Sequence, residues 1–111
     1  MTLRTTLSAL AIVAATPALA ECETVIFSDV GWTDITTTTS AAKQVLAALG
    51  YETEINILSV PITFASLEND DVDVFLGNWM PAQTAAITPY LESGEIESVH
   101  QNLEGTQYTL A

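Results

Sequence analysis

Apolar residues recur along the chain at two spacings, one typical of strands and one typical of helices. Short apolar runs at 24–28 ("TVIFS") and 72–76 ("VDVFL"), and the alternating segment at 54–60 ("EINILSV"), predict three strands. Apolar side chains three and four positions apart predict a helix over 35–49, and Gly50 is a typical helix stop. Strands alternating with helices predict an α/β fold, with a mostly parallel sheet flanked by helices.

Two prolines predict further helices. Proline fits the first turn of a helix but not its interior, so Pro61 predicts a helix over 62–68 that the polar turn "ENDD" ends. Pro81 in the same way predicts a helix that runs toward Leu91 and stops at Ser93-Gly94.

The end of the chain gives weaker signals, with short strands predicted at 96–99 and 107–110. The sequence stops in the strand-like residues "TQYTLA" without a terminating signal. We therefore expect the sequence to be a fragment of a longer chain.

Residues 1–20 have the pattern of a secretory signal peptide. Arg4 gives a cationic start, an apolar stretch covers 7–15, and Ala18-Leu19-Ala20 is a small-residue cleavage site. The apolar stretch is too short to span a membrane. We expect residues 1–20 to direct export and to be cleaved from the mature protein.

Cys22 follows the expected cleavage site by two residues, with Glu21 before it. A lipoprotein signal places the cysteine directly after the cut, so a lipid anchor is not expected. In an oxidising compartment Cys22 either pairs with a segment outside this sequence or remains a free thiol.

The charge is strongly one-sided after residue 20. That part of the chain holds all 14 acidic residues, whereas Lys43 is its only basic residue. An acidic surface without a basic patch repels phosphates, so no nucleic-acid partner is expected. It is compatible with a cationic ligand.

Each of the two tryptophans follows an apolar run. Trp32 lies four residues after the strand at 24–28, and Trp79 lies three residues after the strand at 72–76. Ligands of open α/β sheets bind beyond the carboxyl ends of the strands, so both indoles are predicted at the ligand edge. Gly31 and Gly77 would let the backbone turn there. The alternative is that each ring only covers the edge of the core.

Asp34 has two compatible interpretations. Its carboxylate can cap the following helix, and it can also complement a cation or accept a hydrogen bond from a ligand hydroxyl. Aromatic walls suit flat apolar ligands, sugars, or quaternary ammonium groups, which the faces of the rings attract. A carboxylate beside such rings also complements a cation.

The segments "FSDVGWTDI", "YETEINILSVPITFASLENDDVDVFLGNWMP" and "TQYTL" resemble the N-terminal part of periplasmic choline-binding proteins. These belong to the glycine betaine/choline class of ABC-transporter substrate-binding proteins. The resemblance covers essentially the whole chain after residue 20, and its GWTD and GNWMP segments are specific. It implies a two-lobed periplasmic binding protein (type II-like) that closes on its ligand and delivers it to an ABC transporter permease in the inner membrane. Residues 21–111 would then be the N-terminal portion of a truncated substrate-binding lobe.

By this resemblance the ligand-binding residues would be Trp32, Trp79 and Tyr108 as an aromatic box, with Asp34 on the ligand hydroxyl. Further groups would come from a second lobe beyond Ala111. Choline is favoured over glycine betaine because Asp34 would repel the carboxylate of betaine.

Other functions have less support. Glycine betaine or proline betaine binding is the nearest alternative, and a small secreted α/β enzyme or redox domain with structural tryptophans is the alternative of another class. The alternate spacing of Asn69, Asp71 and Asp73 resembles a calcium loop, but Val74 stands where its glycine should be. Neither a catalytic motif nor a cofactor or metal motif is evident, so we expect neither catalysis nor a cofactor.

Overall fold

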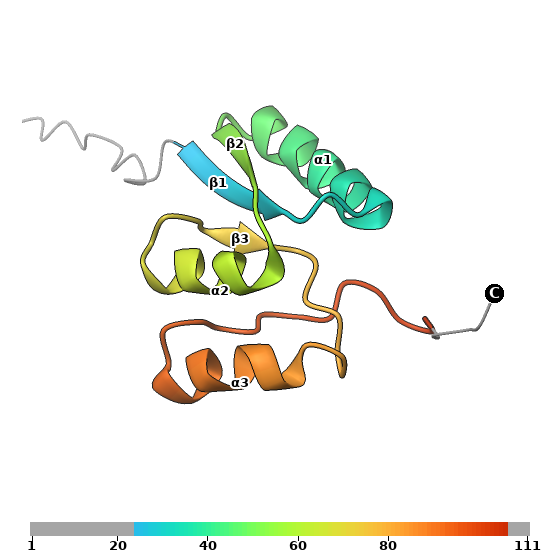
Figure 1. The fold of residues 1–111 in the computed structure, drawn as a ribbon. Coiled ribbons are helices and arrows are strands. Elements are labelled where there is room, and N and C mark those ends of the chain that lie inside the picture. Colours follow the sequence, from blue (N-terminus) through green and yellow to red (C-terminus); the bar gives the residue numbers. More distant parts are fainter. Residues whose placement is uncertain (1–23, 107–111) are drawn as a thin grey trace, which may run out of the picture.

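The structure is a computed structural model that describes residues 24–106 (Figure 1). Four features of the sequence therefore lie outside the described residues: the predicted signal peptide (1–20), Cys22, Tyr108 and the predicted strand at 107–110.

Strands and helices alternate along the described chain. In order they are β1 (Thr24–Asp29), α1 (Thr33–Ala48), β2 (Glu52–Ile57), α2 (Val60–Glu68), β3 (Val74–Phe75) and α3 (Thr84–Ser93). The strands form one parallel sheet in the order β2-β1-β3, and Phe27 of the central strand lies beside Ile55 on one side and Val74 on the other. Figure 1 shows α1 on one side of β1 and β2, with α2 and α3 on the opposite side. The predicted α/β fold with a mostly parallel sheet is confirmed.

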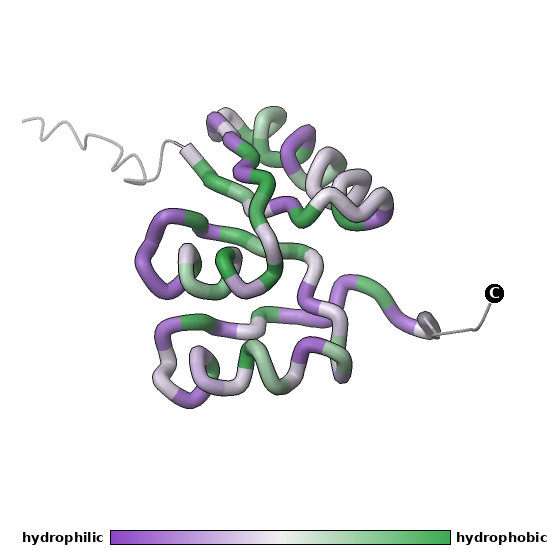
Figure 2. The backbone as a smooth tube through the Cα atoms, viewed as in Figure 1, coloured by the Kyte–Doolittle hydropathy of each residue, from purple (hydrophilic) through white to green (hydrophobic). Residues whose placement is uncertain are grey.

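A small core holds the layers together. Its most buried hydrophobic side chains are Phe27, Ile35, Phe64, Val72 and Ile87. The ring centroid of Phe64 lies 5.9 Å from that of Phe75, edge to face, and 5.9 Å from that of Tyr90. Because these rings come from α2, β3 and α3, Phe64 joins both helices to the sheet. Figure 2 shows hydrophobic residues along β1 and β3 and hydrophilic residues in the turn after α2.

The predicted strand at 54–60 is wrong in its boundaries, since β2 occupies Glu52–Ile57. The backbone N–H of Leu58 still donates to the carbonyl of Asp29 at 2.8 Å, but Val60 is already the first residue of α2. Pro61 lies in the first turn of that helix, as expected, because its fixed φ suits a helix start. The strand therefore ends at Ile57, before the alternating pattern does.

The predicted strand at 72–76 is shortened to two residues, Val74 and Phe75. The backbone N–H groups of Asp71 and Val72 donate to the carbonyl of Ser66, so they close the end of α2 instead of pairing in the sheet. Asp73 is attached to β1 by one backbone and one side-chain hydrogen bond. Its N–H donates to the carbonyl of Ile26 at 2.8 Å, and its Oδ2 accepts from the N–H of Ile26 at 2.7 Å.

Two predictions near the end of the described chain are wrong. The third helix begins at Thr84 and not at Pro81, because residues 80–83 form a turn first. The segment 96–99 is not a strand, and Val99 is 85% exposed. The predicted stop at Gly94 is confirmed, with a left-handed φ of 82°. None of the helices in the described part of the chain has the length and apolar composition of a membrane span.

Candidate functional site

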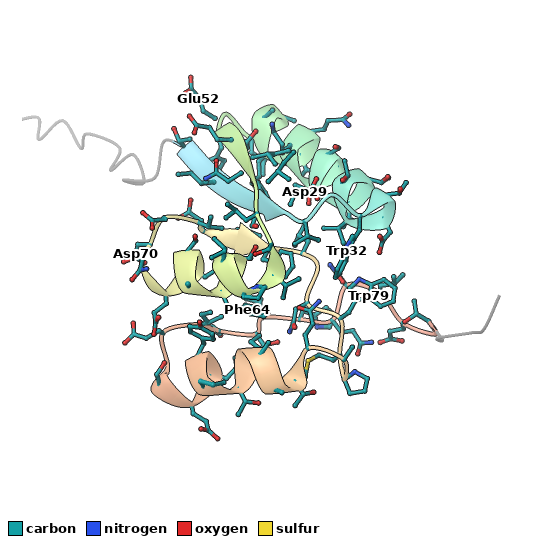
Figure 3. The ribbon with its side chains drawn as sticks, viewed as in Figure 1. Asp29, Trp32, Glu52, Phe64, Asp70 and Trp79 are labelled. Carbon is teal, nitrogen blue, oxygen red and sulfur yellow. The ribbon has the colours of Figure 1, made fainter. Side chains whose placement is uncertain are left out.

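The two tryptophans lie on the loops that leave the carboxyl ends of β1 and β3. Both strands are parallel neighbours in the sheet, so their carboxyl ends share one edge. Trp32 is the residue that caps the amino end of α1, and Trp79 follows β3 by four residues. Figure 3 shows the two labelled indoles next to each other in that view, on the same side of the molecule. The structure therefore places the two aromatic residues that the sequence singled out on loops at the same edge of the sheet.

The loop before Trp32 depends on a left-handed glycine. Gly31 has a φ of 76°, a backbone conformation that residues other than glycine adopt only at a cost in free energy. A Cβ added at this position would meet no atom within 4 Å. The constraint at Gly31 is thus conformational. It turns the chain from β1 so that the indole of Trp32 remains 42% exposed.

The loop that carries Trp79 is held by Gln83. The Nε2 of Gln83 donates to the carbonyl of Gly77 at 3.0 Å, in a buried position, and the backbone N–H of Gln83 donates to the carbonyl of Trp79 at 2.9 Å. The Met80–Pro81 peptide within this loop is cis. Two hydrogen bonds from one residue therefore fix the backbone on either side of the indole, which is partly exposed.

Gly77 serves this loop differently from the way the sequence indicated. It was expected to permit a sharp turn, but its φ is not positive. A Cβ at this position would lie 2.8 Å from Cε2 of Phe75 and 3.1 Å from Cγ1 of Ile35. Glycine is required because the buried loop backbone passes directly against the aromatic ring that closes β3.

Replacing Gly77 by alanine is expected to lower the free energy of unfolding by about 1–3 kcal/mol, the usual cost of overpacking. The added methyl group must displace the Phe75 ring or the loop itself. Chemical denaturation measures the loss. Replacing Phe75 by leucine as well should make the glycine substitution less costly, because the aromatic carbons that it meets are gone. Equal costs in both backgrounds would show that the ring contact is not the cause.

Asp34 and Trp79 border the same hollow. The hollow has a volume of about 1120 Å³, and Asn78 and Thr38 are also among its lining residues. Trp32 is not among them, although it lies two residues before Asp34. The fourth predicted ligand residue, Tyr108, lies outside the described residues. Of the four predicted site residues, the structure thus places an indole and a carboxylate on one concave surface, with a second indole at the neighbouring loop.

Asp34 is not the helix cap that its position suggested. Trp32 occupies the capping position without a side-chain hydrogen bond, and Asp34 lies inside the first turn of α1. A carboxylate there is still favourable, because the amino end of a helix carries partial positive charge. Its carboxylate is exposed and borders the hollow.

Two polar residues of this edge were missed by the sequence reasoning. Asp29, at the end of β1, is only 3% exposed and binds the loop before Trp32. A signal was present, because aspartate two residues before a glycine commonly accepts a hydrogen bond from that glycine's N–H. The second is Gln83, 8% exposed, whose role gives no signal because its partner carbonyl is chosen by tertiary packing.

The side chains at this edge are suited to binding a ligand that carries a cation or a hydroxyl group. Aromatic faces attract cations, and an exposed carboxylate accepts a hydrogen bond from a hydroxyl or balances a positive charge. Within residues 24–106, His, Cys, Asp and Glu side chains form no group of three or more that could hold a metal ion.

An open parallel sheet with aromatic and acidic side chains at its carboxyl edge defines a ligand-binding α/β domain. Residues 23–111 match the family model described as the substrate binding domain of the ABC-type glycine betaine transport system. The chain belongs to this family.

Similar proteins include one sequence and two solved structures. Over 108 residues the chain is 54% identical to uncharacterized protein ORF1 of Chromohalobacter salexigens, covering 95% of this chain and 70% of that protein. It is 63% identical to an ABC-transporter choline binding protein in complex with choline, with a TM-score of 0.65 over 66% of this chain. It is 59% identical to an ABC-transporter choline binding protein in an unliganded semi-closed conformation, with a TM-score of 0.71 over 78% of this chain. The matches cover 25% and 30% of these two solved chains.

Proposed function

We propose that this chain belongs to a substrate-binding protein that captures choline, or a closely related quaternary ammonium compound, for uptake by an ABC transporter. The observation that carries the proposal is the placement of Trp32, Asp34 and Trp79 at one edge of the sheet. The similarity to a choline binding protein solved with choline supports it.

A quaternary ammonium group suits this edge because it carries a diffuse charge and cannot donate hydrogen bonds. Its methyl groups pack on the faces of indoles, and each ring contributes about 0.5–2 kcal/mol depending on its desolvation. Choline adds one hydroxyl, for which Asp34 is the proposed acceptor. Tyr108 is the proposed third ring of the box.

The ring contributions indicate what else the site requires. Once desolvated, three rings at about 1–2 kcal/mol each give about 3–6 kcal/mol. Micromolar binding requires about 8 kcal/mol. We therefore propose that Asp34 and groups from a second lobe, outside residues 21–111, supply the difference when the two lobes close.

The remaining parts of the proposal concern the location of the protein and its partner. Residues 1–20 would direct export to the periplasm as a cleaved signal peptide, and the partner would be an ABC transporter permease in the inner membrane. The family is one of transport substrate-binding domains, in agreement with a role in binding and not in catalysis. We propose no nucleic-acid partner, because an acidic surface without a basic patch repels phosphates.

Choline is expected to bind the full-length protein and to change its tryptophan fluorescence, because the ligand would contact two indoles. Titration by fluorescence and by calorimetry measures the affinity. Tetramethylammonium, which lacks the hydroxyl, should bind more weakly, and ethanolamine, whose primary ammonium is strongly hydrated, should not bind. Equal binding of ethanolamine and choline would contradict recognition by an aromatic box.

Glycine betaine is the second candidate, because it is the substrate named in the description of the matching family. The helix N-terminus at the site would favour its carboxylate, but Asp34 already places a negative charge in that first turn. Choline is therefore the preferred ligand. Competition between the two compounds in the same titration decides between them.

A further inference from the structure

Asp29 is a buried carboxylate that the proposed binding residues do not include. It is the last residue of β1 and is 3% exposed. The backbone carbonyl of Asp29 accepts a hydrogen bond from the N–H of Leu58 at 2.8 Å, which fixes Asp29 at the carboxyl end of the central strand. A carboxylate buried in this way must have a structural or functional reason, because removing it from water is costly without hydrogen bonds.

Each oxygen of this carboxylate holds a different part of the loop that carries Trp32. Oδ1 accepts from the backbone N–H of Gly31 at 2.8 Å, and Oδ2 accepts from the hydroxyl of Thr36 at 2.7 Å. Gly31 comes just before the indole, and Thr36 lies in the first turns of α1 just after it. The carboxylate therefore connects the two ends of the segment 31–36, with Trp32 and Asp34 inside it.

This connection compensates for a weak start of α1. The capping residue, Trp32, makes no side-chain hydrogen bond to the helix. The first backbone hydrogen bond of the helix runs from the N–H of Thr36 to the carbonyl of Trp32 at 2.8 Å. Without an ordinary cap the first turn would fray readily. The Asp29–Thr36 hydrogen bond holds the same turn from the side of the sheet.

We infer that Asp29 is a positioning residue for ligand binding, which orients Trp32 and Asp34 through Gly31 and Thr36. Figure 3 shows Asp29 at the end of β1, where the chain passes to Trp32. The inference rests on the proposed function in so far as its consequence is affinity for a quaternary ammonium ligand. Its structural part, the ordering of the indole of Trp32, is independent of any ligand.

Three variants in the first turns of α1 isolate this hydrogen bond. Thr36→Val keeps the shape of the side chain and removes the donor to Asp29. Thr36→Ser keeps the hydroxyl and serves as the conservative rescue. Thr37→Val is the matched control, because the hydroxyl of Thr37 donates only within the helix, to the carbonyl of Thr33 at 2.7 Å.

The ligand-free measurement is fluorine NMR of the full-length protein labelled with 5-fluorotryptophan. Replacing Trp32 by phenylalanine assigns its resonance. Thr36→Val should shift or broaden the Trp32 resonance and leave that of Trp79 in place, whereas Thr36→Ser and Thr37→Val should leave both unchanged. An unchanged Trp32 resonance in Thr36→Val would overturn the inference.

The ligand measurement is calorimetry with choline at a temperature where all variants are folded. Thr36→Val is expected to weaken binding about three- to tenfold, while the other two variants bind as the unmodified protein. The effect is smaller than the full loss of a hydrogen bond to a charged group, because this bond acts on the ligand only through the orientation of Trp32 and Asp34. A lower melting temperature with unchanged affinity would show that the bond only stabilises the fold, and would also overturn the inference. If the unmodified protein does not bind choline, the proposed function fails, and the fluorine spectra still decide whether Asp29 orders Trp32.

Discussion

Replacing Trp79 by alanine is expected to abolish choline binding by the full-length protein. The indole borders the hollow, and its loop is fixed by the two hydrogen bonds of Gln83, so the ring is presented in a defined position. Its removal loses about 2 kcal/mol of cation–π attraction and a similar amount from lost burial, which together raise the Kd by about a thousandfold.

The measurement is calorimetric titration, with thermal unfolding followed in parallel because Trp79 is partly buried. Trp79→Phe should bind choline at an intermediate affinity, since a smaller ring remains. Tyr51→Ala is the control, because Tyr51 is an aromatic residue next to the amino end of β2, at the opposite edge of the sheet. Undiminished affinity of folded Trp79→Ala for choline would contradict the aromatic-box proposal.

Replacing Asp34 by asparagine is expected to reduce the preference for choline over glycine betaine by about tenfold or more. Choline loses a hydrogen bond from its hydroxyl to a charged acceptor, which contributes about 1.5–3 kcal/mol. Betaine instead gains, because its carboxylate no longer faces a negative charge at the first turn of α1. The two effects act in opposite directions, so the ratio of the two dissociation constants is the sensitive quantity.

Glu92→Gln provides the matched control, because it removes one carboxylate from α3, and Glu92 is not among the residues that line the hollow. It changes the net charge by the same amount as Asp34→Asn, so a purely global effect of charge would appear in both variants. An unchanged ratio in Asp34→Asn would mean that its carboxylate serves only the amino end of the helix.

Much of the architecture was predictable because it depends on local pattern. Apolar periodicity identified β1 and α1, and Gly50 and Gly94 ended their helices with the left-handed φ values that glycine permits. Strand–helix alternation then implied parallel pairing, and parallel pairing implied that Trp32 and Trp79 share one edge.

The predicted ends of strands and helices that were wrong depend on which of two nearby carbonyls accepts a hydrogen bond from a backbone N–H group. Whether the N–H groups of Asp71 and Val72 donate to the carbonyl of Ser66 or to a neighbouring strand is a choice between two hydrogen bonds of similar strength, and the sequence pattern does not rank them. The same holds for the start of the third helix, where the turn at 80–83 precedes Thr84.

The sequence by itself determined the class of fold, the edge of the sheet at which we propose that a ligand binds, and the aromatic and acidic residue types that suit a quaternary ammonium ion. Each of these follows from periodicity and from the chemistry of single side chains. Only the tertiary structure showed that Gly77 is required by the nearness of Phe75, that Asp34 is not a cap, and that Asp29 connects Gly31 to Thr36. These are contacts between elements, fixed by packing distances of a few ångströms that no spacing along the chain encodes.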